Sequence, residues 1–157
     1  MDAFKRITII SLLAGFLSFS FAEQNWFGVR TGYPLGVTLH YGIENGLQNG
    51  FDLRVSANLR VRNPNDVDFG IGIDGMNEIY IDNPITVYIG GGPALDFNGN
   101  SALIDVHGLL GGEFRFSDVG LRPFGVFAEI SLGAGIGIGR NSQIPSVGGA
   151  VGFNWHF

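Results

Sequence analysis

Apolar and polar side chains alternate strictly along most of this chain. The alternation is clearest over residues 51–61, where Phe51, Leu53 and Val55 begin an apolar face that opposes Asp52 and Arg54. Successive side chains of a β-strand point to opposite faces of its sheet. This pattern therefore predicts strands that are apolar on one face and polar on the other.

Eight such runs follow one another, and most of them reach the nine to eleven or so residues that a tilted membrane-spanning strand requires. We predict an all-β fold, an eight-stranded antiparallel up-and-down transmembrane β-barrel. The expected connections include polar turns at Glu44–Gly50 and Arg62–Asp66 and a longer one over Met76–Pro84. The fifth strand is expected to bulge or bend at Gly90–Pro93. The expected strands are Asn25–Tyr33, Leu35–Ile43, Phe51–Val61, Val67–Asp74, Ile85–Phe97, Ala102–Phe116, Val126–Ile138 and a terminal strand after Ser146.

Glycine indicates which face of the barrel lies inside. An eight-stranded interior is just wide enough for side chains, so charged groups mixed with glycine can fill it. A solvated exterior has no need of so many glycines, each of which costs backbone entropy. The charged face carries Gly28, Gly32, Gly36, Gly42, Gly70, Gly72, Gly111, Gly125, Gly133, Gly148 and Gly152.

We therefore expect the apolar face to meet lipid. Aromatic residues near the strand ends would then form girdles at the two membrane interfaces. The alternative is a soluble lipocalin-like barrel, in which the apolar face lies inside. The expected girdle residues are Trp26, Tyr41, Phe51, Phe69, Phe97, Phe114, Phe124 and Trp155.

The first residues predict export. Lys5 and Arg6 precede an apolar run, Ile7–Leu17, and small residues follow at Ser20–Ala22. This run is too short to span a bilayer and is typical of a secretory signal peptide. We predict a signal peptide over residues 1–22 and a single barrel domain over residues 23–157.

Charge and cysteine content narrow the classes of function. Lys5 is the only lysine, and residues 23–157 hold seven arginines against thirteen acids, a formal charge of 7 − 13 = −6. A negative balance argues against nucleic-acid binding, which needs a basic surface. The absence of cysteine from the sequence excludes disulfides and thiolate metal sites.

The final alternating run ends on aromatic side chains. Val151, Phe153, Trp155 and Phe157 share one face of the predicted last strand. This end resembles the last strand of bacterial outer-membrane barrels, and the whole pattern is similar to the small eight-stranded type, that of the OmpA transmembrane domain and OmpX. The resemblance implies a bacterial outer-membrane location, a plugged interior, and a C-terminal strand that the barrel-assembly machinery reads.

Charged residues on the interior face suggest specific pairs. If the third and fourth strands pair about a turn at Pro64, Arg54 lies opposite Asp74 and Arg60 lies opposite Asp68. Buried ions need partners, and opposite charges across strands attract. We predict two salt bridges that plug the barrel. His40, His107, Glu113, Arg115 and Glu129 are expected to extend this polar interior.

An even number of strands places both ends of the barrel chain on one side of the membrane, and the connections on the other side are short. Long outer loops, which normally carry substrate capture and adhesion, are therefore not expected.

We expect a structural protein or an accessory subunit of a larger envelope assembly, with outer-membrane lipid around it and no cofactor. Small outward-facing residues (Gly108, Gly112, Ala128, Ala134 and Gly149) would let a neighbour approach closely.

Two other functions stay open at this point. A narrow pore for ions or small solutes would use the interior charges as a selectivity ring. A lipid-modifying outer-membrane enzyme would need a nucleophile with a base, for which Ser131, His107 and Glu129 are the candidates. The oxygen ligands of Asp96–Asn100 also suggest a cation site at a turn.

Overall fold

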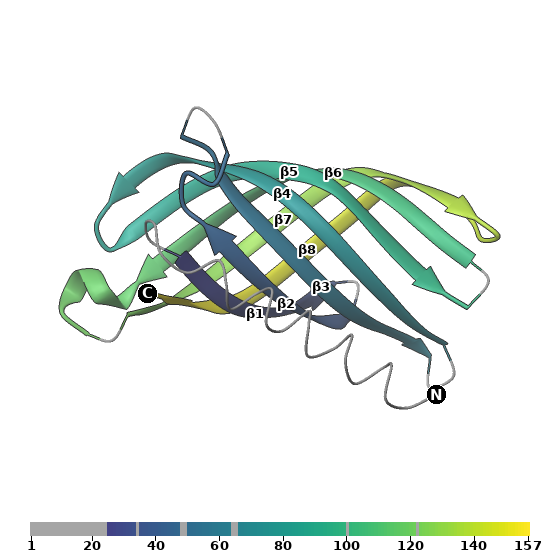
Figure 1. The fold of residues 1–157 in the computed structure, drawn as a ribbon, viewed down its shortest axis with the longest axis horizontal. Coiled ribbons are helices and arrows are strands. Elements are labelled where there is room, and N and C mark those ends of the chain that lie inside the picture. The colour runs from purple at the N-terminus through teal and green to yellow at the C-terminus, as the bar shows by residue number, and fades with distance from the viewer. Residues whose placement is uncertain (1–24, 34, 48–49, 64–65, 100, 122) are drawn as a thin grey trace.

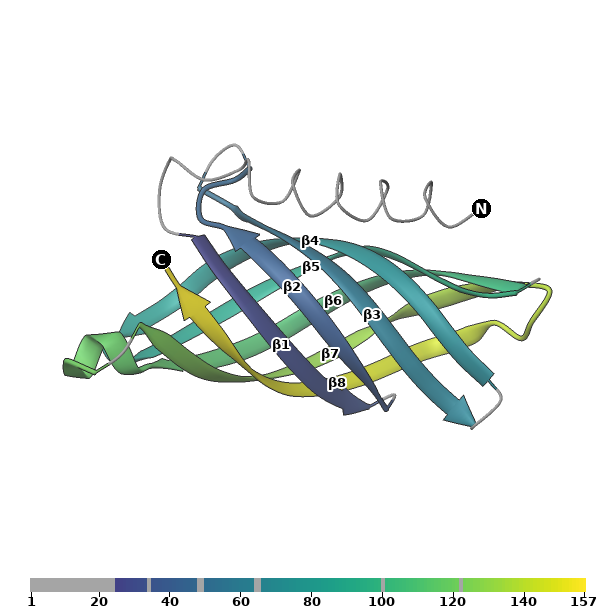
Figure 2. The same cartoon turned by 60° about the horizontal axis from the view of Figure 1, so that its bottom comes forward.

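The eight strands form one closed antiparallel barrel in which each strand pairs with its neighbours in the chain and β1 pairs with β8. The computed structural model describes residues 25–33, 35–47, 50–63, 66–99, 101–121 and 123–157. The predicted signal peptide and the turn residues Pro34 and Pro64 lie outside this part of the chain. The strands, shown in Figures 1 and 2, are β1 Asn25–Tyr33, β2 Gly36–Ile43, β3 Asp52–Asn63, β4 Asp66–Asp82, β5 Ile85–Asn98, β6 Ser101–Arg115, β7 Phe124–Ile138 and β8 Gln143–His156.

The predicted eight-stranded up-and-down topology is confirmed, but the predicted end of the fourth strand is wrong. Residues 75–82 continue β4 and pair with β5, so the connection expected over Met76–Pro84 shrinks to Asn83 and Pro84. This part of β4 is not recognisable in the sequence because Met76 and Asn77 interrupt the alternation of apolar and polar residues. Met76 takes a lumenal position beside the barrel's other buried apolar residues.

Two other details differ from the sequence prediction. No register shift falls at Gly90–Gly92, whereas one does fall in β4 between Glu78 and Tyr80. β8 begins at Gln143, earlier than the terminal strand predicted after Ser146. A short 3-10 helix, η1 (Phe116–Val119), lies in the connection between β6 and β7.

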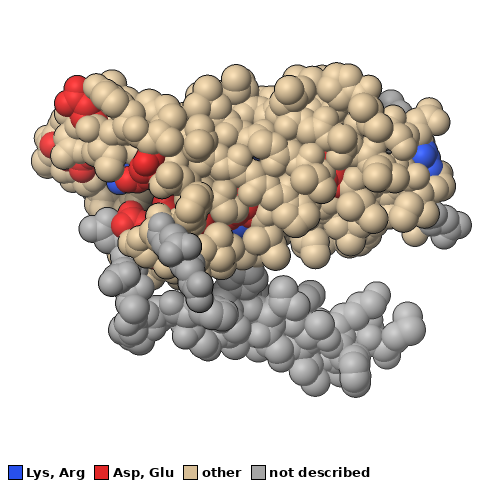
Figure 3. Space-filling view, turned by 90° about the horizontal axis from the view of Figure 1, so that it is seen from above, with Lys and Arg blue, Asp and Glu red and all other residues tan. Residues whose placement is uncertain are grey.

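The barrel has an apolar exterior and a polar interior. Ile71, Ile130 and Leu132 point outward with 51%, 64% and 62% of their surface exposed, whereas Arg54 and Asp74 point inward with 2% and 1% exposed. Charged groups in Figure 3 gather at the two ends, and the middle of the surface is almost free of them. This polarity is opposite to that of a lipocalin-like soluble barrel, so that alternative is wrong.

Aromatic rings surround the end of the barrel where Asn25 and Phe157 lie. The register places Tyr41 beside Phe27, Phe27 beside Trp155, and Trp155 beside Phe124. The ring of Phe124 in turn lies 4.6 Å from that of Phe116, next to Phe114. At the opposite end, Phe69 and Phe97 meet edge to face at 5.3 Å.

Trp26 is not part of this aromatic girdle, and that prediction is wrong. Its side chain is only 5% exposed and lies in the lumen, while Phe27 takes the outward position. The reason is the parity of β1, because Trp26 shares its face with Gly28, Arg30 and Gly32.

Glycines on the lumenal face provide the space for large side chains. A Cβ at Gly42 would collide with the indole ring of Trp26, and one at Gly111 would collide with the ring of Tyr88. The predicted mixture of glycine and large polar groups is therefore how this narrow interior is filled. Within the described residues, no helix is long and apolar enough to cross a membrane.

Candidate functional site: the barrel interior

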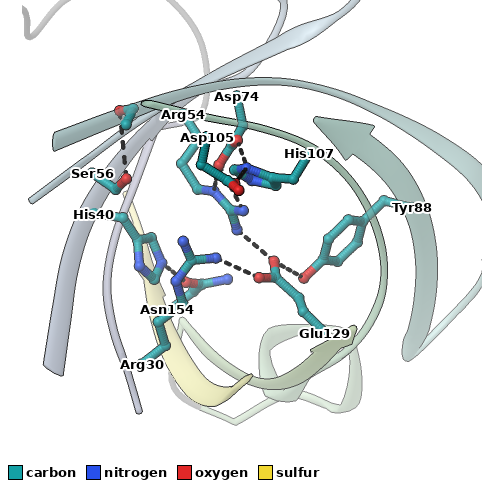
Figure 4. A network of polar contacts seen from close by, with 11 residues as sticks. Arg30, His40, Arg54, Ser56, Asp74, Tyr88, Asp105, His107, Glu129 and Asn154 are labelled. Atoms are coloured by element: carbon teal, nitrogen blue, oxygen red, sulfur yellow. Dashed lines mark hydrogen bonds and ion pairs between the residues drawn. The ribbon is translucent and has the colours of Figure 1, made fainter. Parts of the chain in front are cut away.

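Every strand contributes a polar side chain to the interior near the middle of the barrel (Figure 4). These side chains come from all sides of the lumen and meet across it, which a strand-by-strand pattern cannot show. In chain order from β1 to β8 they are Arg30, His40, Arg54, Asp74, Tyr88, His107, Glu129 and Asn154.

Arg54 lies at the centre of this layer. Its Nη2 and Nε donate to Asp74 Oδ2 at 2.9 and 3.1 Å, and its Nη1 donates to Glu129 Oε1. Glu129 also accepts hydrogen bonds from Arg30 Nη1 at 2.5 Å and from the Tyr88 hydroxyl at 2.8 Å. The predicted opposition of Arg54 and Asp74 is the observed register. A fully buried guanidinium thus joins carboxylates from β4 and β7, two strands that are not neighbours.

His107 extends the same network from β6. Its Nε2 lies 3.2 Å from Asp74 Oδ1, and its Nδ1 lies 3.1 Å from Asp105 Oδ2. The Nδ1 contact has hydrogen-bond geometry, and the Nε2 contact is an ion pair when the ring carries both protons. Arg30, Arg54 and His107 thus face three carboxylates (Asp74, Asp105 and Glu129).

A second group of ion pairs lies toward the end of the barrel that carries the shorter connections. Arg60 Nη1 donates to Asp96 Oδ2 at 2.6 Å, and Arg140 Nη1 donates to Asp68 Oδ2 at 3.2 Å. Arg60 and Asp68 are opposite one another in the register, as the turn symmetry predicts, but the predicted salt bridge between them is replaced by ion pairs to Asp96 and Arg140. The sequence alone did not indicate the partners Asp96 and Arg140.

The cation site suggested for Asp96–Asn100 is not supported at its first ligand. Asp96 is fully buried in the lumen and bonded to Arg60 instead of facing the turn. Asn100 lies outside the described residues. In the part of the chain that the structure describes, no cluster of His, Cys, Asp or Glu has the arrangement needed to hold a metal ion.

A polar cavity of about 100 Å³ lies in this half of the lumen. Ser131 and His107 both line it, as do Arg30 and Arg60, but the third candidate for a catalytic set, Glu129, is bonded to Arg30, Arg54 and Tyr88. Both ring nitrogens of His107 face the carboxylates of Asp74 and Asp105.

An apolar layer fills the lumen on the other side of Arg54. It consists of Trp26, Met76, Tyr88 and Leu109, each no more than 7% exposed. The sequence suggested none of these as lumenal residues. Trp26 and Arg30 could have been assigned to the lumen from the sequence, because they share a face of β1 with Gly28 and Gly32.

A third polar group follows at the end of the barrel where Asn25 and Phe157 lie. Glu113 accepts hydrogen bonds from Asn154 Nδ2 and His156 Nε2, both at 2.9 Å, and it also pairs with Arg115. Arg115 makes a further ion pair with Glu78. Asn154 also links this group to the central layer, because its Oδ1 lies 2.7 Å from His40 Nε2. The predicted interior residues His40, Glu113 and Arg115 are thereby joined.

The last strand presents its predicted apolar face outward. Val151, Phe153, Trp155 and Phe157 are 57%, 53%, 44% and 59% exposed. The backbone of Phe157 also exchanges two hydrogen bonds with Asn25, at 2.9 and 3.0 Å, which closes the barrel between β8 and β1.

Comparison with known proteins gives one structural likeness. The sequence matches no protein-family model and no curated protein. The chain is similar to the crystal structure of Neisserial surface protein A, with a TM-score of 0.46 and 11% sequence identity over 85% of this chain and 92% of that one.

Proposed function

We propose that this chain is an integral outer-membrane barrel with a plugged interior, and that its role is structural or that of an accessory subunit in a larger envelope assembly. The observation that carries the proposal is the buried Arg54, which ties β3 to carboxylates on β4 and β7 across a lumen surrounded by an apolar exterior.

The membrane location is supported by the polarity of the barrel. A closed barrel is the one β-structure that satisfies all of its backbone groups in lipid. Soluble monomers rarely expose contiguous apolar patches larger than a few hundred Å². Here large apolar residues are exposed on all eight strands, and aromatic rings gather near both ends, as in membrane barrels.

The plugged lumen is supported by the way the interior charges are paired. A selectivity ring needs charges of one sign that face a water-filled path. In this barrel the central charges neutralise one another, and the apolar layer around Trp26 and Met76 fills the lumen beside them. An ion would have to separate buried pairs in order to pass, which costs several kcal/mol per pair.

A role without catalysis is part of the same proposal. It is supported by the orientation of His107, whose ring nitrogens face Asp74 and Asp105 at 3.2 and 3.1 Å. Export by a cleaved signal peptide and insertion by the barrel-assembly machinery also belong to it. The outward face of β8, with Phe153, Trp155 and Phe157, supports recognition by that machinery.

The test combines membrane fractionation with electrical recording. We expect the protein to sediment with outer-membrane vesicles, to migrate differently on gels when heated, and to give no discrete channels in planar bilayers. Channels that the Arg54→Ala substitution abolishes would establish a pore in place of the plug. Lipid A that changes on overexpression, and no longer changes with Ser131→Ala or His107→Ala, would establish an enzyme.

A further inference from the structure

One strand of this closed barrel has an open edge. Pairing between β3 and β4 ends where Asp52 meets Met76, but β4 continues to Asp82 and pairs there with β5 alone. Figure 1 shows this end of the β4–β5 hairpin, in teal, projecting beyond β3. Among the described residues, no strand lies along the other side of residues 77–82, which we call the open edge of β4.

An open edge matters because it presents backbone donors and acceptors to any extended chain. Closed barrels normally remove such edges, and exposed ones are normally protected from pairing. The β2–β3 connection does not continue the pairing here. Instead it folds back on itself, with Leu47 N bonded to Phe51 O and the Leu47 side chain near Gly75.

Three consecutive side chains on this edge are apolar and exposed. Ile79, Tyr80 and Ile81 have 52%, 53% and 60% of their surface exposed. The register shift between Glu78 and Tyr80 keeps Tyr80 on the outer face and turns Ile81 to the inner one. The edge therefore offers apolar contact on both faces of any strand that pairs with it.

Charge identifies the kind of partner. Asp82 ends the open edge, which carries no basic residue, whereas Glu78 faces the lumen and is already paired with Arg115. Figure 3 shows acidic groups clustered at this end of the molecule. These acidic surroundings favour a basic strand as the partner of the open edge.

We propose that residues 77–82 are a docking edge for an extended segment of another envelope protein, in which arginine or lysine alternates with apolar residues. The segment would add a strand to β4 and bring a basic side chain to Asp82. This inference deepens the accessory role proposed above, because it names the surface and the chemistry of the partner.

The first test is binding of a synthetic peptide of about eight residues, the length of an ordinary strand, in which arginine and valine alternate. Fluorescence anisotropy with the folded barrel in zwitterionic detergent reports the affinity. A peptide with glutamate in place of arginine controls for charge. A peptide N-methylated at every second residue keeps the charge but loses one row of backbone donors. We expect the arginine peptide to bind. Each control peptide should bind with an affinity at least roughly tenfold lower, which corresponds to a loss of about 1.4 kcal/mol in binding free energy.

Protein variants then locate the site. Asp82→Arg should weaken binding of the arginine peptide and strengthen binding of the glutamate peptide. Asp118→Arg makes the same charge change on an exposed residue of η1, which packs against β7 and not along β4, so it should leave both affinities nearly unchanged. Ile81→Pro and Asp82→Pro remove adjacent N–H groups, which point to opposite sides of the strand. One of the two variants removes an N–H group of the open edge and should lose peptide binding while the β4–β5 pairing stays intact. The other removes an N–H group on the β5 side of the strand.

Hydrogen exchange separates the outcomes. We expect fast amide exchange at alternate residues of 77–82 in the free protein and slow exchange there with the arginine peptide bound. Peptide binding that survives N-methylation and responds equally to Asp82→Arg and Asp118→Arg would overturn the proposal in favour of simple charge attraction. Slow exchange in the free protein together with dimers would assign the edge to a second copy. The proposed plugged membrane barrel would stand in either case, since fractionation and conductance test it separately.

Discussion

At the scale of single residues, Arg54 is the group on which the interior most depends. Its removal would leave Asp74 and Glu129 buried, with one cation fewer to balance them. Breaking a buried ion pair by removing one partner costs about 3–5 kcal/mol. We therefore expect Arg54→Ala to lower the free energy of unfolding by about that amount, measured from urea midpoints of the barrel in lipid vesicles.

The control for Arg54→Ala is a second substitution that removes the uncompensated charge. Asp74→Asn in the Arg54→Ala background should restore part of the lost stability, because an amide is less costly to bury than an unpaired carboxylate. An unchanged urea midpoint in the single variant would contradict the interpretation of Arg54 as a plug.

Gly42 shows how tightly the lumen is filled. An added Cβ would collide with the Trp26 indole, which is enclosed by the barrel wall. We expect Gly42→Ala to destabilise the barrel by about 1–3 kcal/mol, the usual cost of overpacking a core. Gly112→Ala is the matched control, since its Cβ would find its nearest neighbour, Thr86 O, at 3.9 Å. Equal urea midpoints for the two variants would show that Trp26 can move aside.

At the scale of strands, the sequence could predict what depends on alternation and on adjacent register. Arg54 lies opposite Asp74 because a single turn between consecutive strands, β3 and β4, sets their register. Arg54 also meets Glu129, and Arg60 meets Asp96. Those contacts cross the lumen or skip a strand, so they depend on the stagger and tilt of the whole barrel. No local pattern encodes that stagger, and for this reason Tyr88, Arg30 and Arg140 were not recognised as partners.

The outward face of β7 provides a direct test of the membrane location. Ile130 is 64% exposed in the middle of the strand, and Ile144 is 73% exposed near the start of β8. On a soluble protein, arginine at either exposed position would cost little. In a bilayer we expect Ile130→Arg to destabilise the barrel by about 2–4 kcal/mol and Ile144→Arg by no more than about 1 kcal/mol, because the cost depends on depth. Equal and small effects in vesicles would contradict the proposed lipid-facing surface.

At the scale of the whole molecule, the two ends of the barrel differ. The end with Asn25 and Phe157 carries the longer connections, residues 44–51 and 116–123, and the projecting β4–β5 hairpin. The opposite end is closed by the short connections 34–35, 64–65, 99–100 and 139–142. Binding regions usually lie on projecting segments supported by a rigid scaffold. If both ends of the barrel chain lie in the periplasm, as in the proposed outer-membrane orientation, this contact surface faces the periplasm.

That asymmetry leads to a prediction about the assembly in which the protein works. Extracted from its own membranes in mild detergent, the barrel should migrate in a complex well above the size of one chain, together with a larger envelope protein. Asp82→Arg should release it from that complex, because it reverses a charge at the open edge, whereas Asp118→Arg should not. Release must be judged on protein that still shows heat-modifiable migration, so that loss of folding is not mistaken for loss of contact. A barrel that migrates alone from native membranes would argue against the accessory role and leave a purely structural one, since the proposed plug and the apolar exterior do not depend on a partner.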